Sequence, residues 1–137
     1  VQQRILPALR RGALVLCDRY VDSSVAYQGV GRGLGAASIA ELNDWATSGL
    51  TPDLTVVLDI DPAVSRARQT QRDGGAADRM ESADDAFRAR LRAAFLDRAA
   101  AAPQRYLVVD AAAEPVQIHQ QIQTRLQPML KNSAVAP

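Results

Sequence analysis

Cysteine and an excess of charge of either sign are nearly absent from this sequence. Cys17 is the single cysteine among 137 residues, so no internal disulfide can form, as is usual in reducing compartments. Sixteen basic and fifteen acidic side chains leave a formal net charge of +1, which gives no electrostatic attraction to nucleic acid or to a membrane surface. No apolar run approaches the roughly 20 residues of a membrane helix, and no signal peptide is visible. These absences predict a cytoplasmic protein that binds neither nucleic acid nor membranes.

Three short apolar runs, at residues 14–17, 54–60 and 106–110, read as buried strands of the kind found in parallel sheets. The long links between them carry helical patterns, as parallel crossovers require. Apolar residues make up 47% of the chain and charged residues 23%, which is typical of a soluble globular domain. The sequence therefore predicts an α/β fold. Because Cys17 lies in the first strand run, we expect a buried, unreactive thiol there.

Apolar residues three and four positions apart predict helices between and after these strands. Asp61 and Pro62 form an N-cap and first-turn pair that begins the helix after the second strand. Trp45 is expected to be a core anchor, and His119, the single histidine, is expected to be exposed. The expected inward stripes are Ile39, Leu42, Trp45 and Ala46 over 36–48, then Phe87, Leu91, Ala94 and Phe95, and finally Val116, Ile118, Ile122, Leu126 and Met129 over 114–130.

An acidic and a basic residue stand where the first apolar run ends. In open α/β sheets, ligands bind beyond the carboxyl ends of the strands. Asp18 is a hard oxygen ligand suited to a metal ion, and Arg19 offers a planar fork of donors that matches a phosphate. If the next residues are helical, one face carries Tyr20, Ser24, Tyr27 and Gln28, a polar wall suited to an aromatic ligand. The alternative is a capping carboxylate with a surface ion pair.

The run over residues 18–29 resembles the signature of the thymidylate kinases, which phosphorylate dTMP to dTDP. The resemblance implies that Asp18 lies near Mg²⁺ and the acceptor phosphate, as a catalytic residue and metal ligand. It implies that Arg19 grips the phosphate of dTMP. The other implied substrate-binding residues are Tyr20 in the pocket wall, Ser24 and Gln28 at the thymine edge, and Tyr27 under the deoxyribose.

A glycine-rich segment at residues 29–35 follows this signature. It lacks the Lys-Ser/Thr ending of a P-loop and follows a helix rather than a strand, so it reads as a flexible turn.

Arginines are concentrated in the segment 66–82, around a Gly-Gly pair. A solvated charged helix end is one reading. The other is a lid, because arginines that close over a transferring phosphoryl group stabilise its charge and exclude water. The segment resembles the lid of thymidylate kinases, and the positions that match are Arg68, Arg72, Asp78, Arg79 and Glu81. The resemblance implies that Arg68, Arg72 and Arg79 are catalytic and bind the triphosphate of ATP, and that Asp110 and Ala111 help to hold its adenine.

The resemblance covers only the later part of the family. It implies a three-layer, P-loop-kinase-like parallel sheet with strand order 2-3-1-4-5 and helices on both faces, of which the first two strands are absent here. Residues 1–130 are then a partial nucleoside-monophosphate-kinase domain and 131–137 a tail, and we expect the chain to be part of a longer kinase.

The implied function is phosphoryl transfer from ATP to dTMP with Mg²⁺, within dTTP biosynthesis and as a homodimer. One alternative is a non-catalytic fragment or regulatory module that binds dTMP and cannot hold ATP. Another is a kinase for a different nucleoside monophosphate, against which the run at residues 26–29 argues.

Overall fold

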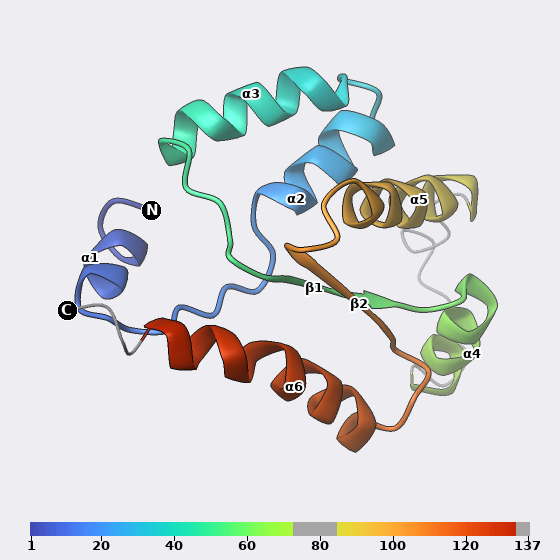
Figure 1. Cartoon of the computed structure of the whole chain (residues 1–137). Coiled ribbons are helices and arrows are strands. Elements are labelled where there is room, and N and C mark those ends of the chain that lie inside the picture. The colour runs from blue at the N-terminus through green and yellow to red at the C-terminus, as the bar shows by residue number, and fades with distance from the viewer. Residues whose placement is uncertain (73–84, 134–137) are drawn as a thin grey trace. The chain divides into compact units, whose positions relative to one another are not determined.

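The computed structural model describes residues 1–72 and 85–133 (Figure 1). The chain divides into two compact units. The first comprises Val1–Thr51 with the residues from Leu126 onward, and the second comprises Pro52–Arg125. No helix in the part of the chain that the structure describes is both long and apolar enough to cross a membrane.

The first unit begins with a short helix and an extended segment. Helix α1 spans Ile5–Arg10, and Gly12 ends it with a positive φ of 74°. The predicted strand at residues 14–17 does not form, and Leu16 is 96% exposed. A strand is stable only when a neighbour completes its hydrogen-bond ladder, and the described part of this unit contains no strand. Cys17, expected to be buried, is exposed for the same reason.

The signature residues form one continuous helical segment. Helix α2 spans Val21–Ser24 and continues as the π-helix η1 over Val25–Gly31. A β-carbon at Gly29 would lie 2.9 Å from the Cα of Ala36, so the glycine permits close packing against the next helix. The predicted turn therefore starts later than expected: it occupies residues 32–35, where Gly35 has a positive φ of 89°.

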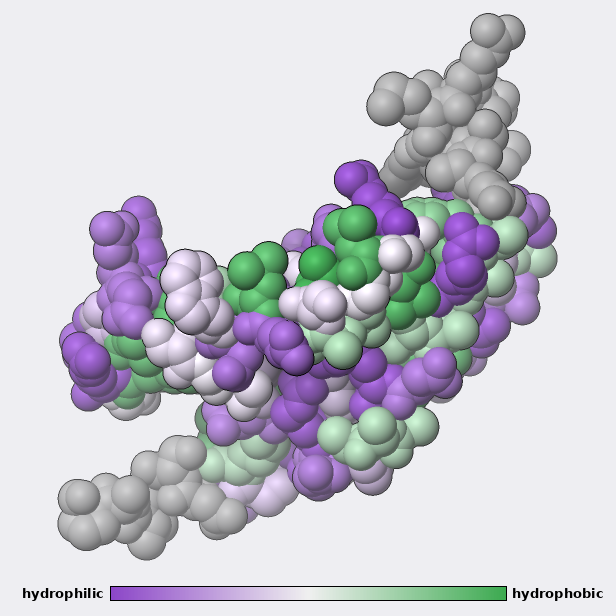
Figure 2. Space-filling view, turned by 90° about the horizontal axis from the view of Figure 1, so that it is seen from above, coloured by the Kyte–Doolittle hydropathy of each residue, from purple (hydrophilic) through white to green (hydrophobic). Residues whose placement is uncertain are grey.

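Helix α3 spans Ala36–Thr47, but its inner side differs from the predicted stripe. Trp45 is 81% exposed and Leu42 is 57% exposed, so Trp45 is not a core anchor. Figure 2 shows hydrophobic residues, in green, on the surface of the molecule. Ile39 is half-buried as predicted, whereas Ala46 is exposed, and the other more buried positions are Ala40, Asn43 and Thr47. Asn43 donates a hydrogen bond to the carbonyl of Val21 in α2, so the side of α3 that carries Asn43, rather than the side that carries Trp45, faces the neighbouring helix.

The second unit contains the two strands. Strand β1 (Thr55–Asp59) pairs in parallel with β2 (Tyr106–Asp110), with Thr55 opposite Tyr106 and Asp59 opposite Asp110. Helix α4 (Pro62–Arg72) and helix α5 (Asp85–Ala101) lie between the strands in sequence. The predicted cap is confirmed, since the Oδ1 of Asp61 accepts a 2.8 Å hydrogen bond from the backbone N–H of Ala63.

The core of the second unit lies where α5 packs along both strands (Figure 1). Its buried side chains are Leu91, Ala94 and Ala99 of α5 with Tyr106 and Val109 of β2. The stripe predicted for α5 is confirmed: Leu91 and Ala94 are buried, and Phe87 and Phe95 are half-buried.

Helix α6 spans Pro115–Ser133 and so includes the first three residues of the predicted tail, whose other residues lie outside the described part of the chain. Ile118, Ile122, Leu126 and Met129 are half-buried as predicted, and His119 is exposed. Val116 was predicted to face inward with Ile118 but is 63% exposed. The two residues are two positions apart, and such residues do not share a face of a helix.

Candidate functional site

The signature residues gather around an open pocket of about 500 Å³ in the first unit. This volume is within the roughly 300–1,000 Å³ range of small-molecule sites. The extended segment before α2, the helices α2 and η1, and α3 all contribute to it. Its lining residues are Arg19, Tyr20, Val21, Ser23, Ser24, Tyr27, Gln28, Asn43 and Thr47. The structure thus brings together every residue that the sequence predicted for substrate binding.

Arg19 and Tyr27 contact each other within this pocket. The guanidinium carbon of Arg19 lies 4.5 Å from the centre of the Tyr27 ring, a cation–π distance. The backbone of Arg19 has a φ of 64°, in the left-handed region that side chains other than glycine rarely adopt. The hydroxyl of Tyr20, the residue directly after Arg19, donates a 3.3 Å hydrogen bond to the carbonyl of Leu50. Tyr20 is therefore fixed as a wall of the pocket.

Asp18 precedes the pocket-lining residues and is exposed. In the described part of the chain, no group of three or more acidic, histidine or cysteine side chains gathers to hold a metal. Mg²⁺ commonly takes only one or two protein carboxylates and completes its shell with water and substrate phosphates. An exposed carboxylate next to Arg19 fits that requirement.

Two pocket residues on α3 were missed by the sequence analysis. Asn43 donates a 3.3 Å hydrogen bond from Nδ2 to the carbonyl of Val21, which ties α3 to the first turn of α2. The hydroxyl of Thr47, a buried residue, donates a 2.8 Å bond to the carbonyl of Asn43. The four-residue spacing of Asn43 and Thr47 was the available signal, because residues four apart on a helix share one face.

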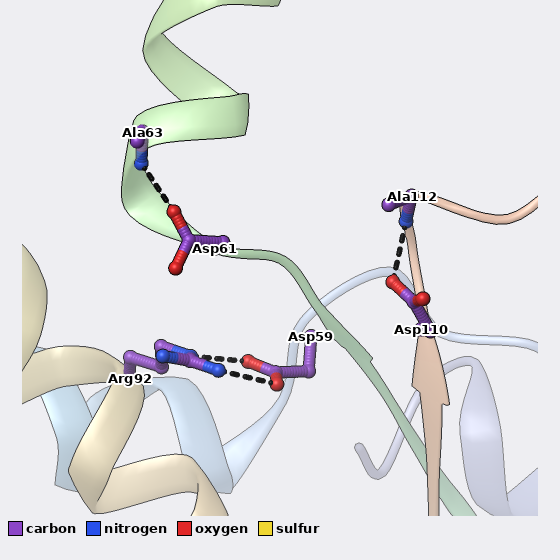
Figure 3. A network of polar contacts seen from close by, with 6 residues as sticks. All are labelled: Asp59, Asp61, Ala63, Arg92, Asp110 and Ala112. Carbon is purple, nitrogen blue, oxygen red and sulfur yellow. Dashed lines mark hydrogen bonds and ion pairs between the residues drawn. The ribbon is translucent and has the colours of Figure 1, made fainter.

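A second group of polar residues lies at the carboxyl ends of β1 and β2 (Figure 3). Asp59 accepts two hydrogen bonds from Arg92 of α5, at 2.6 and 2.8 Å. These bonds from Arg92 hold the pKa of Asp59 below its usual value, and burial opposes them only in part. At the end of β2, the Oδ1 of Asp110 accepts a 2.8 Å bond from the backbone N–H of Ala112. Asp59 and Asp110 therefore stabilise the strand ends.

Arg68 is joined to the loop after β2. Its Nη1 donates to the carbonyl of Ala111 at 2.8 Å, and its Nη2 donates to the carbonyl of Ala112 at 3.2 Å. The structure thus brings Arg68 together with Asp110 and Ala111, all of which the sequence predicted to serve ATP. Of the other predicted lid residues, Arg72 is the last residue of α4, whereas Asp78, Arg79 and Glu81 lie outside the described residues.

A solved structure establishes the class of fold. The chain matches the crystal structure of thymidylate kinase from Ehrlichia chaffeensis with a TM-score of 0.66 and 28% sequence identity, over 92% of this chain and 55% of that one. The parallel strand pair and its helices are therefore part of a P-loop-kinase-like α/β fold, as the sequence predicted.

Sequence comparison identifies the family. The family model described as thymidylate kinase matches residues 1–122. The curated thymidylate kinase of Cutibacterium acnes is 47% identical to this chain over 95% of the chain. The thymidylate kinase of Pseudomonas fluorescens is 50% identical over 94% of the chain. The chain belongs to the thymidylate kinase family. It spans 61% and 60%, respectively, of the length of these two relatives.

Proposed function

We propose that the protein carrying these residues transfers the γ-phosphoryl group of ATP to dTMP, yielding ADP and dTDP for dTTP synthesis. The observation that carries this proposal is the pocket in which Arg19 lies beside two tyrosines, a glutamine and two serines. This set combines a phosphate-binding fork with aromatic surfaces and neutral hydrogen-bonding groups. A pyrimidine nucleotide monophosphate presents the matching groups. Membership in the thymidylate kinase family supports the same acceptor.

In this proposal each pocket residue meets one part of dTMP. Arg19 binds the phosphate through its N–H donors. Ser24 and Gln28 read the thymine edge, since a hydroxyl and an amide each offer a donor and an acceptor. Tyr27 lies under the deoxyribose and disfavours a 2′-hydroxyl. Tyr20 supplies the wall.

ATP is held by the second unit in this proposal. Asp110 and Ala111 help to hold the adenine. Arg68, Arg72 and Arg79 act as catalytic residues and close on the triphosphate from a lid at residues 66–82. Asp18 would hold Mg²⁺, which when bound neutralises charge on the phosphates. An oxygen of the acceptor phosphate forms a bond to the γ-phosphorus while the bond from that phosphorus to the β–γ bridging oxygen breaks. Rate enhancement comes from positioning and charge stabilisation.

The remaining sequence predictions belong to the same proposal. Residues 1–130 form a partial nucleoside-monophosphate-kinase domain, and the whole enzyme is a cytoplasmic homodimer. We also predict that the enzyme binds neither nucleic acid nor membranes.

A coupled assay over dTMP, dUMP, dCMP, GMP and AMP tests this function. We expect dTMP to be the preferred acceptor and Arg19→Ala to remove most of the activity. Another preferred acceptor would contradict the proposal. Tight binding of dTMP to the 137-residue chain with no turnover in any form of the protein would instead favour the non-catalytic dTMP-binding module.

A further inference from the structure

Arg19 has an unusual backbone conformation for its residue type. Its φ of 64° is one of two positive φ values among non-glycine residues in the described ranges, the other being Ser48. Ser48 follows the last residue of α3, where a left-handed residue commonly ends a helix. Arg19 ends no helix and lies two residues before α2. A strained residue persists where its surroundings hold it, and such residues often occur at ligand sites.

In the pocket, the guanidinium of Arg19 contacts the ring of Tyr27. The 4.5 Å separation places the cation over the ring. Tyr27 lies in η1, is half-buried, and lines the same pocket, whereas the side chain of Arg19 is exposed. A ring under a guanidinium does not consume its N–H donors, so those donors stay available to an anion.

We propose that Tyr27 is a positioning residue for Arg19, and that its ring holds the guanidinium at the pocket so that the fork meets the phosphate of the nucleotide. The proposal rests on the binding of dTMP proposed above and assigns Tyr27 a second task beside its contact with the sugar. Tyr27 then contributes to phosphate affinity without touching the phosphate. Arg19 needs little reorganisation when the nucleotide arrives, which lowers the cost of binding.

Binding of dTMP and of thymidine, which lacks the phosphate, tests this role by calorimetry. The ratio of the two affinities isolates the contribution of the phosphate. In Tyr27→Leu we expect this ratio to fall about two- to fivefold, the effect of losing one partly exposed cation–π contact. Tyr27→Phe keeps the ring and is expected to keep the ratio. In an Arg19→Ala background, Tyr27→Leu should leave the ratio unchanged, since the two residues act through one interaction.

A purely sugar-binding Tyr27 would weaken both ligands equally in Tyr27→Leu, and its effect would add to that of Arg19→Ala. Either result overturns the proposal. The stacking itself is checked without nucleotide, because the Tyr27 ring should shift the NMR signals of the Arg19 side chain upfield and Tyr27→Leu should remove this shift. Unshifted signals in the free protein would overturn the positioning role and leave the kinase function standing. Failure of the parent protein to bind dTMP would overturn the proposed function and the inference together.

Discussion

Replacing Gly29 by alanine tests how tightly the signature helix packs against α3. The added β-carbon would lie 2.9 Å from the Cα and 3.3 Å from the backbone nitrogen of Ala36, and 3.4 Å from the carbonyl oxygen of Gly35. All three neighbours are backbone atoms, so a side-chain rotation cannot relieve the contact. Overpacking of this kind costs about 1–3 kcal/mol. Alanine regains about 0.5–1 kcal/mol through its better helix propensity.

The net expectation for Gly29→Ala is a loss of up to about 2.5 kcal/mol in the free energy of unfolding. With a urea dependence of about 1–3 kcal/mol per molar, the midpoint of urea unfolding should fall measurably. Far-UV circular dichroism is the assay. Because residues of both η1 and α3 line the pocket, separation of these helices should also distort it, so dTMP affinity should fall with stability.

The matched control for Gly29→Ala is Ala36→Gly, made alone and in combination with Gly29→Ala. Because the clash is with the backbone of Ala36, removal of its methyl group should not rescue Gly29→Ala. Ala36→Gly alone should cost less than about 1 kcal/mol, because that penalty of glycine applies to a helix interior and Ala36 is the first residue of α3. The losses of the two single changes should add. A higher urea midpoint for Gly29→Ala, as propensity alone predicts, would refute the close approach.

Three further predictions concern the polar contacts. Arg92→Met removes the hydrogen bonds that lower the pKa of Asp59. The stabilisation that these bonds give exists above the unfolded-state pKa of Asp59 and is lost as the pH falls through the folded-state pKa. The difference in urea midpoint between the parent protein and Arg92→Met should therefore be larger at pH 7 than at pH 3. An equal difference at the two pH values would contradict this prediction. Arg68→Ala removes both bonds to the loop after β2, so the KM for ATP should rise while that for dTMP stays unchanged. Arg66→Ala on the same helix is its control, because Arg66 pairs with an exposed carboxylate instead. Asn43→Leu removes the bond from α3 to α2 and should weaken dTMP binding by about two- to tenfold in calorimetry, the effect of one neutral hydrogen bond; unchanged affinity would exclude that role.

Elements specified by local signals were predictable from the sequence. Asp61 and Pro62 predicted the start of α4. The apolar run predicted to be a strand at residues 106–110 has the same bounds as the observed strand β2. The run at residues 14–17 is also apolar but forms no strand, because a strand depends on a partner that its own residues cannot supply. Trp45 was misplaced for a related reason. Hydropathy identifies apolar residues, but it does not show that Asn43 bonds to α2 and that this side of α3 faces the neighbouring helix.

In the candidate site, too, residues close together in sequence could be predicted and contacts between distant segments could not. Helical spacing from Tyr20 to Gln28 was enough to predict one polar wall, and those residues line one pocket. Asn43 and Thr47 escaped prediction because they enter the pocket from α3, beyond the reach of that spacing. The carbonyl partners of Arg68 were equally hidden, since they lie more than forty positions away along the chain.

Trp45, the chain's only tryptophan, turns α3 into an optical reporter. An indole that is 81% exposed emits at the long wavelengths of a hydrated fluorophore. Any molecule or chain segment that covers this side of α3 will shift the emission toward the blue and shield it from soluble quenchers. Fluorescence titration can therefore follow the covering of this helix without a label.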